Sequence, residues 1–154
     1  RKAVALLEIL VNKQVQQTTQ EKQANTSSTS QTLFNLKLLA YERIILFIER
    51  IKPDSFIPRT LSPSLPYQEY QLLLINEIRK EFEYNLSQQL YLSENAWEVT
   101  VNFKDNIITL INSAATSCPP QATASDLARK ILEHYISSDL KGHQISKIVK
   151  AEIQ

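Results

Sequence analysis

Apolar residues recur every three or four positions along most of the chain, which is the spacing of one face of an α-helix. The clearest run begins after Thr32, a predicted N-cap, and Pro53 must end it because proline cannot continue a helix. The pattern therefore predicts a long helix between these two residues. Its apolar face is made by Leu33, Leu36, Ala40, Ile44, Phe47 and Ile51.

The first 24 residues start apolar, with Val4, Leu7 and Leu10, and then turn polar. We expect residues 1–24 to form an N-terminal amphipathic helix or a membrane-proximal segment. Residues 25–30 read NTSSTS, side chains that compete with backbone hydrogen bonds. This composition predicts a flexible polar linker over residues 25–31, and residues 32–154 then form the helical domain.

A proline-rich connector of about 15 residues follows the long helix, and its apolar side chains are expected to pack over the core. The next helix should start within residues 64–67 and continue to Leu90, with an apolar residue at every fourth position from Leu74. Ser125 opens a later helix, and residues 144–154 predict a short final one.

The segment from Trp97 to Phe103 fits two patterns. Its residues alternate between apolar and polar, as in a strand, but Ala96, Phe103 and Ile107 also continue one helical face. No turn residue interrupts the segment, so we favour a helix that is capped by Ser93.

The composition favours helices throughout. A single Gly argues against an all-β fold, because tight hairpin turns need residues that accept a positive φ. An apolar fraction of 43% is enough for one core. We expect an all-α bundle of five to six helices, with the proline-rich connector after the second.

The sequence contains no recognisable catalytic or metal-binding constellation. It has one cysteine, Cys118, and two histidines, His134 and His143, which lie nine positions apart, and it has no Glu-x-x-His motif of the kind that places zinc or di-iron ligands on one helix face. One Gly excludes a phosphate-binding glycine loop and a nucleophile elbow. We therefore predict that the chain is not an enzyme, that it has no cofactor or metal and that it takes no small-molecule substrate.

Two sets of residues are candidates for an interface or for fixing helix register. Arg43 lies beside the apolar stripe. A half-buried contact between an arginine of this helix and a glutamate of the following long helix would fix the register between them, but solvated faces with pairs at i and i+4 are the favoured interpretation. Aromatic residues that combine apolar area with a polar tip suit interfaces. The candidates are Tyr41, Arg43, Tyr67, Tyr70, Tyr84 and Trp97.

Two other functions stay open on the sequence. The charge balance of 17 Lys+Arg against 16 Asp+Glu makes nucleic acid an unlikely partner. A nucleic-acid-binding or regulatory domain would use the basic C-terminal set Arg129, Lys130, Lys141, Lys147 and Lys150. An enzyme would need a cleft of carboxylates such as Glu42, Glu77 and Glu81.

Two segments resemble an uncharacterised family from Bacteroidota. They are LKLLAYERIILFIERIKP at residues 36–53 and EIRKEFEYNLSQQLY at 77–91, the latter followed by Ser93 and by Ala96 and Trp97. The resemblance covers residues 36–114. It implies a small helical protein on the cytoplasmic side of the inner membrane, anchored by a segment upstream of Arg1, and it implies no activity.

The sequence does not determine the function beyond this point. The best hypothesis is a helical protein–protein interaction or scaffold module that binds another protein or itself, so that a homo-oligomer is a possible form.

Overall fold

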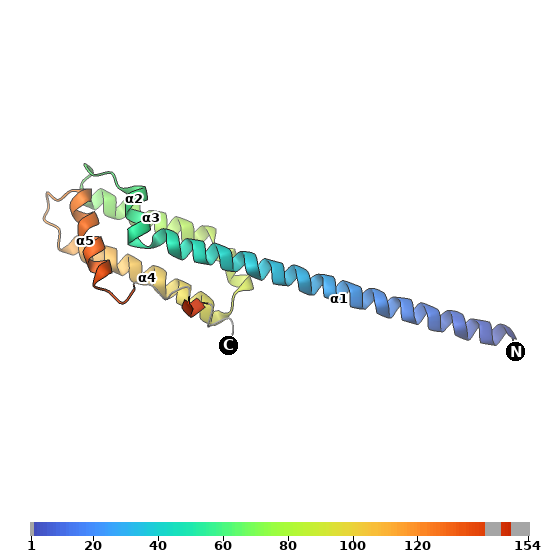
Figure 1. Cartoon of the computed structure of the whole chain (residues 1–154). Helices are drawn as coiled ribbons and strands as arrows, with labels where there is room; N and C mark the ends of the chain where they lie inside the picture. The colour runs from blue at the N-terminus through green and yellow to red at the C-terminus, as the bar shows by residue number, and fades with distance from the viewer. Residues whose placement is uncertain (1, 141–145, 149–154) are drawn as a thin grey trace. The chain divides into compact units, whose positions relative to one another are not determined.

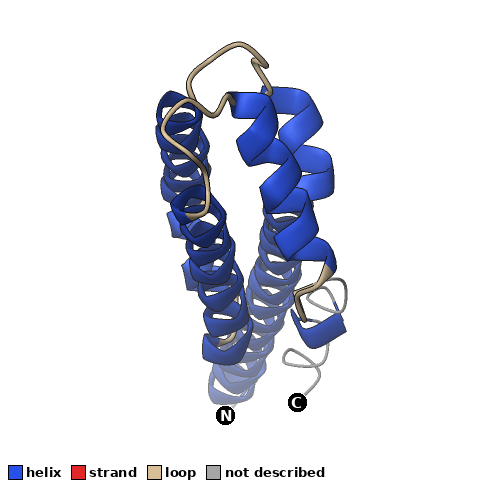
Figure 2. Ribbon diagram, turned by 90° about the vertical axis from the view of Figure 1, so that its left-hand side faces the viewer, coloured by secondary structure: helices blue, strands red, loops and turns tan. Residues whose placement is uncertain are grey.

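The computed structural model describes residues 2–140 and 146–148 (Figure 1). Figure 2 shows helices and loops only, and no strand occurs among the described residues, which confirms the all-α class. Residues 146–148 of the expected final helix are helical, and the rest of that segment lies outside the described residues. The elements are α1 (Lys2–Ile51), α2 (Pro53–Thr60), α3 (Tyr67–Tyr84), the 3₁₀ helix η1 (Leu86–Tyr91), α4 (Glu94–Thr116) and α5 (Ala124–Ile136).

The chain divides into two units, residues 1–38 and residues 39–154. In the first unit, the described side chains are exposed except for the partly exposed Leu36. The second unit contains the core. None of the described helices combines the length and the apolarity that a bilayer crossing requires.

The expected flexible linker at residues 25–31 is wrong, because α1 is helical throughout this stretch. The stretch holds no Gly or Pro that would break a helix. Its hydroxyls bond inside the helix instead of competing with it: Thr29 Oγ1 donates to the carbonyl of Asn25 at 2.8 Å, and Thr32 Oγ1 donates to that of Ser28 at 3.0 Å.

The core of the second unit includes the C-terminal part of the stripe predicted for the long helix, whereas Leu33 and Leu36 of that stripe lie in the first unit and are not buried. Ile44, Phe47 and Ile51 of α1 are all buried. Pro53 ends α1 as expected, but the connector after it is partly helical. Pro53 becomes the first residue of α2, a position that needs no backbone N–H, and α2 buries Phe56 and Ile57 over the core.

The third helix is shorter than the periodicity predicts. α3 ends at Tyr84, and Leu86 and Leu90 are exposed instead of continuing its buried face. Asn85 ends the helix: its side-chain amide donates to the carbonyl of Glu81 at 2.8 Å and satisfies an acceptor that the helix leaves open. The chain then tightens into η1.

The helix expected over Trp97 to Phe103 is confirmed as part of α4. Ser93 caps it by accepting a hydrogen bond from the backbone N–H of Ala96 at 3.1 Å. Thr100 is fully buried in the core, and its hydroxyl donates to the carbonyl of Ala96 at 2.9 Å. The burial of one helical face therefore determines the structure of this segment, although its apolar and polar residues alternate as in a strand.

α5 starts from a capping box at Thr123, two residues before Ser125, which the sequence indicated as the start. The hydroxyl of Thr123 accepts from the N–H of Asp126, while the carboxylate of Asp126 accepts from the N–H of Thr123 at 3.0 Å. Lys130 donates to the carbonyl of Ser117 and so helps to close the end of α4. α3, α4 and α5 pack against one another, and α2 packs against α5.

This capping box gives a pH-dependent term in stability. The backbone N–H of Thr123 lowers the pKa of Asp126 below its ordinary value, with smaller contributions from the Thr123 hydroxyl, Arg129 and Lys130. Because the folded-state pKa is the lower one, this contribution is present above pH of about 4 and is lost as pH falls through the folded-state value.

We therefore expect Asp126→Asn to be less stable than the wild type near neutral pH, with a difference that shrinks as pH falls below about 4. Urea titrations between pH 7 and pH 2.5 measure this difference. A difference in the free energy of unfolding that stays constant over this pH range would show that the ionised carboxylate of Asp126 does not contribute to stability.

Candidate functional site

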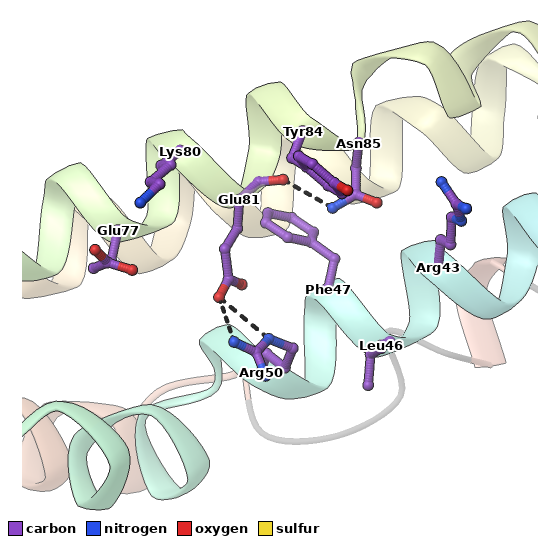
Figure 3. A pocket seen from close by; sticks show the side chains of 9 residues that line it. All are labelled: Arg43, Leu46, Phe47, Arg50, Glu77, Lys80, Glu81, Tyr84 and Asn85. Carbon is purple, nitrogen blue, oxygen red and sulfur yellow. Dashed lines mark hydrogen bonds and ion pairs between the residues drawn. The ribbon is translucent and has the colours of Figure 1, made fainter.

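A groove of about 490 Å³ opens between α1 and α3 within the second unit (Figure 3). Both walls come from helices that the core holds in place, because Phe47 of α1 and Ile78 of α3 are buried. The groove is lined by Arg43, Leu46, Phe47, Arg50, Glu77, Lys80, Glu81, Tyr84 and Asn85.

Apolar side chains that the fold leaves in solvent stand on both walls of the groove. Leu46 is 59% exposed on α1, and Tyr84 is 81% exposed on α3. Phe47 lies between the helices and reaches toward α3, where its ring lies 6.0 Å from that of Phe82. The groove is therefore an apolar surface on a rigid base.

An ion-pair cluster joins the two walls. Glu81 Oε1 accepts from both Nη2 of Arg50, at 2.7 Å, and Nε, at 3.2 Å. Arg59 of α2 lies 3.5 Å from the same oxygen and donates to the carbonyl of Arg50 at 3.0 Å. The hydrogen bond to Glu81 and then its charge raise the pKa of Arg50.

Three further charged groups line the groove outside this cluster, and the charge of one of them, Glu77, also contributes to raising the pKa of Arg50. Within the described part of the chain, Arg43, Lys80 and Glu77 make no ion pair. In Figure 3, Arg43 lies toward one end of the groove, beside Asn85 and Tyr84, whereas Glu77 lies toward the other end. A ligand in the groove would thus meet a cation at one end and an anion at the other.

Aromatic packing supports the α3 wall from behind. The ring of Phe82 stacks on Trp97 of α4 with the centroids 5.4 Å apart. Lys104 Nζ lies 4.0 Å from the Phe82 centroid and 3.1 Å from Asp105 Oδ1. This packing holds α3 against α4 next to the groove. A rigid wall favours binding because it loses little conformational entropy when a ligand binds.

A comparison with protein families matches residues 2–154 to DUF7935, a family of unknown function. The chain belongs to this family. The match extends over the N-terminal segment as well as the 36–114 region in which the sequence resembled a known family. No curated protein and no solved structure matches the chain.

The structure brings two of the six interface candidates of this DUF7935 chain to the groove, Arg43 and Tyr84. An arginine–glutamate contact does join the two long helices, but its arginine is Arg50, two turns further along α1 than Arg43, and it pairs with Glu81. Trp97 is partly buried against Phe82, and Tyr67 is partly buried at the start of α3. The aromatic candidates therefore do not form one surface.

Tyr41 and Tyr70 face the core in different ways. The hydroxyl of Tyr41 is buried without a hydrogen-bond partner among the described residues. The hydroxyl of Tyr70 lies 2.9 Å from Thr60 Oγ1. Because Thr60 already donates to the carbonyl of Phe56, Tyr70 is the donor in this pair. Burial raises the pKa of Tyr70, against the opposing effect of Thr60.

These two tyrosines should respond in opposite ways to loss of the hydroxyl. Tyr70→Phe should lower the free energy of unfolding by about 1 kcal/mol, because it removes a satisfied hydrogen bond. Tyr41→Phe should be neutral or stabilising, because the hydroxyl it removes has been desolvated without compensation. Urea denaturation of both variants checks this; equal losses would contradict it.

Leu46 and Lys80 line the groove but were not among the candidates from the sequence. Leu46 carried a signal: it is an apolar residue on the side of α1 that holds Arg43 and Arg50, away from the buried stripe. Lys80 carried none, because a lysine on the charged side of a helix is ordinary.

The residues proposed for other functions do not converge in the described structure. Glu77 and Glu81 line the groove but Glu42 does not, and Glu81 is held by two arginines. No group of three or more His, Cys, Asp or Glu among the described residues could hold a metal ion. Of the basic C-terminal set, Arg129 pairs with Asp126, Lys130 bonds to Ser117, Lys147 is exposed, and Lys141 and Lys150 lie outside the described residues.

Proposed function

We propose that this DUF7935 chain is a non-catalytic interaction module that binds an α-helix of a protein partner in the groove between α1 and α3. The observation that carries the proposal is the pair of exposed apolar side chains, Leu46 and Tyr84, on opposite walls of a groove whose base is fixed by the core. Amphipathic helices bind in such apolar grooves through residues spaced three and four apart.

The charges support a helix as the ligand. The central Arg50–Glu81 pair neutralises itself, so it adds little repulsion, while Arg43 and Glu77 remain to contact side chains at the two ends of a bound segment. Charged groups at the rim of an apolar contact set orientation and selectivity more than they set affinity. A peptide helix offers both kinds of side chain.

Photo-crosslinking tests this function. A photoreactive amino acid placed at position 46, in cells that express the chain, should form one discrete crosslinked product with a protein partner. The same amino acid at Leu72 is the matched control, because Leu72 is also an exposed leucine, at 62% against 59%, and does not line the groove. Equal smears at both positions, or no adduct at Leu46, would reject the groove as a binding site.

The cellular location stays a separate prediction. The proposed module works on the cytoplasmic face of the inner membrane, where the sequence resemblance implies a tether upstream of Arg1. Separation of membranes from cytosol after expression of the complete reading frame tests the tether, and the groove proposal does not depend on the result.

A further inference from the structure

A second hollow, of about 810 Å³, opens within the second unit where η1 meets the start of α4. It shares no lining residue with the groove between α1 and α3. Its apolar lining is made by Leu90, Leu92, Trp97 and Val101. Leu90 is 81% exposed, so the fold leaves an apolar side chain in solvent at this site as well.

The floor of the hollow is one face of α4. The lining residues of this helix stand at positions 94, 97, 98 and 101, three or four residues apart, so they share that face. The opposite face packs into the core, where Phe103 is buried. Trp97 is held from behind by its stacking on Phe82. A ligand would therefore meet a floor that needs little ordering.

The rim of the hollow is acidic. Glu94 and Glu98 both line it and are exposed, and neither forms an ion pair within the described residues. No lysine or arginine from the described part of the chain lines the hollow. Carboxylates four residues apart on a helix repel each other. The N-terminal partial charge of α4 favours Glu94, in the first turn, but Glu98 lies a full turn further along. A cationic ligand would remove this repulsion.

The spacing of the two carboxylates fits a helix as the ligand. Residues four apart are separated by about 6 Å along the axis of α4, at 1.5 Å per residue. Cations one turn apart on a helix that lies along α4 have the same separation, so they can meet both carboxylates. An apolar residue on the adjoining face of that helix would then contact Leu90 and Trp97.

We infer that this hollow binds a cationic amphipathic helix of a protein partner, with lysines or arginines against Glu94 and Glu98 and an apolar residue beside Leu90 and Trp97. Apolar contact supplies most of the affinity, and the charges select the partner and its orientation. The groove between α1 and α3 offers a cation as well as an anion, so the two sites suit different partners. The inference does not depend on the function proposed for that groove.

Peptide binding to the full chain tests the chemistry of the site, and Trp97 is the reporter because the only tryptophan lines the hollow. The probe is a synthetic peptide of leucine and lysine, about 14 residues or four helical turns long, with its leucines on one face. It should shift the emission of Trp97. The double variant Glu94→Lys, Glu98→Lys should bind it at least about tenfold more weakly and should instead bind a leucine–glutamate peptide of the same pattern.

Matched controls separate this contact from a general effect of net charge. The double variant Glu42→Lys, Glu133→Lys makes the same change at two exposed carboxylates outside the hollow, and at 0.15 M salt it should leave the affinity within about twofold. Leu90→Ser should weaken binding at least about fivefold, whereas Leu72→Ser, at another exposed leucine, should not. Urea titrations check that each variant stays folded.

A photoreactive amino acid at position 90, in cells that express the chain, identifies the occupant. Mass spectrometry should find the crosslink on a segment of another protein that is rich in lysine or arginine. A crosslink to this chain's own sequence, to a segment without basic residues, or no crosslink at all would overturn the inference. So would a leucine–lysine peptide that leaves Trp97 emission unchanged up to a concentration on the order of 100 µM, or that binds both double variants equally.

Discussion

Phe103→Ala should lower the free energy of unfolding of the second unit by about 3–5 kcal/mol, the largest loss we expect from a single truncation. Phe103 is 2% exposed on α4 and belongs to the core that α1, α3 and α5 also build. Its removal loses the transfer free energy of the ring and leaves a cavity that the surrounding helices cannot fully close.

Urea denaturation followed by the fluorescence of Trp97, the only tryptophan, measures this loss in the second unit. Leu72→Ala is the control, because Leu72 is an exposed apolar residue on α3 and its truncation should change the free energy by no more than about 0.5 kcal/mol. A loss below about 1 kcal/mol for Phe103→Ala would mean that α4 is not packed as described.

Leu46→Asp should abolish most of the groove's affinity without destabilising the fold. Leu46 is exposed in the free chain, so the substitution should change the free energy of unfolding by no more than about 0.5 kcal/mol. In the complex, the same position would place a carboxylate against an apolar helix face. Central apolar contacts of an interface contribute about 2–4 kcal/mol, which corresponds to a loss of affinity of about 30- to 1000-fold.

This variant separates binding from folding. Its association is measured by light scattering over a concentration series or with the captured partner, and its stability by the same fluorescence titration. Leu72→Asp is the matched control on the α3 surface outside the groove. Unchanged association of Leu46→Asp would show that the groove is not the contact, and a large loss of stability would show that Leu46 has a structural role.

Much of the second unit could be predicted from the sequence because its core follows regular spacing. Ile44, Phe47 and Ile51 are buried as the pattern of α1 requires, and Pro53 ends the helix for a local steric reason. Ser93 is a local signal of the same kind, since a hydroxyl next to free N–H groups caps a helix wherever it stands.

The features that the sequence did not predict depend on context. Residues 25–31 hold the side chains of a linker, yet they bond within a helix that continues on both sides. Leu86 and Leu90 keep the spacing of α3, but Asn85 ends the helix before them. Local composition cannot settle such cases.

The candidate groove was still less accessible to sequence analysis, because it depends on how two helices are paired. Arg43 and Arg50 both lie on α1 near acidic residues of the following helix, and only the packing of α1 against α3 decides that Arg50 meets Glu81. In this packing, Arg43 has no ion pair within the described residues, and Leu46 beside it is exposed.

The most direct test of the central claim, that a helix covers this groove, is cysteine labelling in intact producing cells. In a Cys118→Ser background, which removes the only native cysteine, Leu46→Cys and Leu72→Cys are compared for their rate of reaction with a membrane-permeant maleimide. The free chain exposes both positions almost equally. We predict that the cysteine at 46 reacts at least tenfold more slowly in cells than the one at 72, and that denaturation removes the difference. Equal rates in cells would contradict the account.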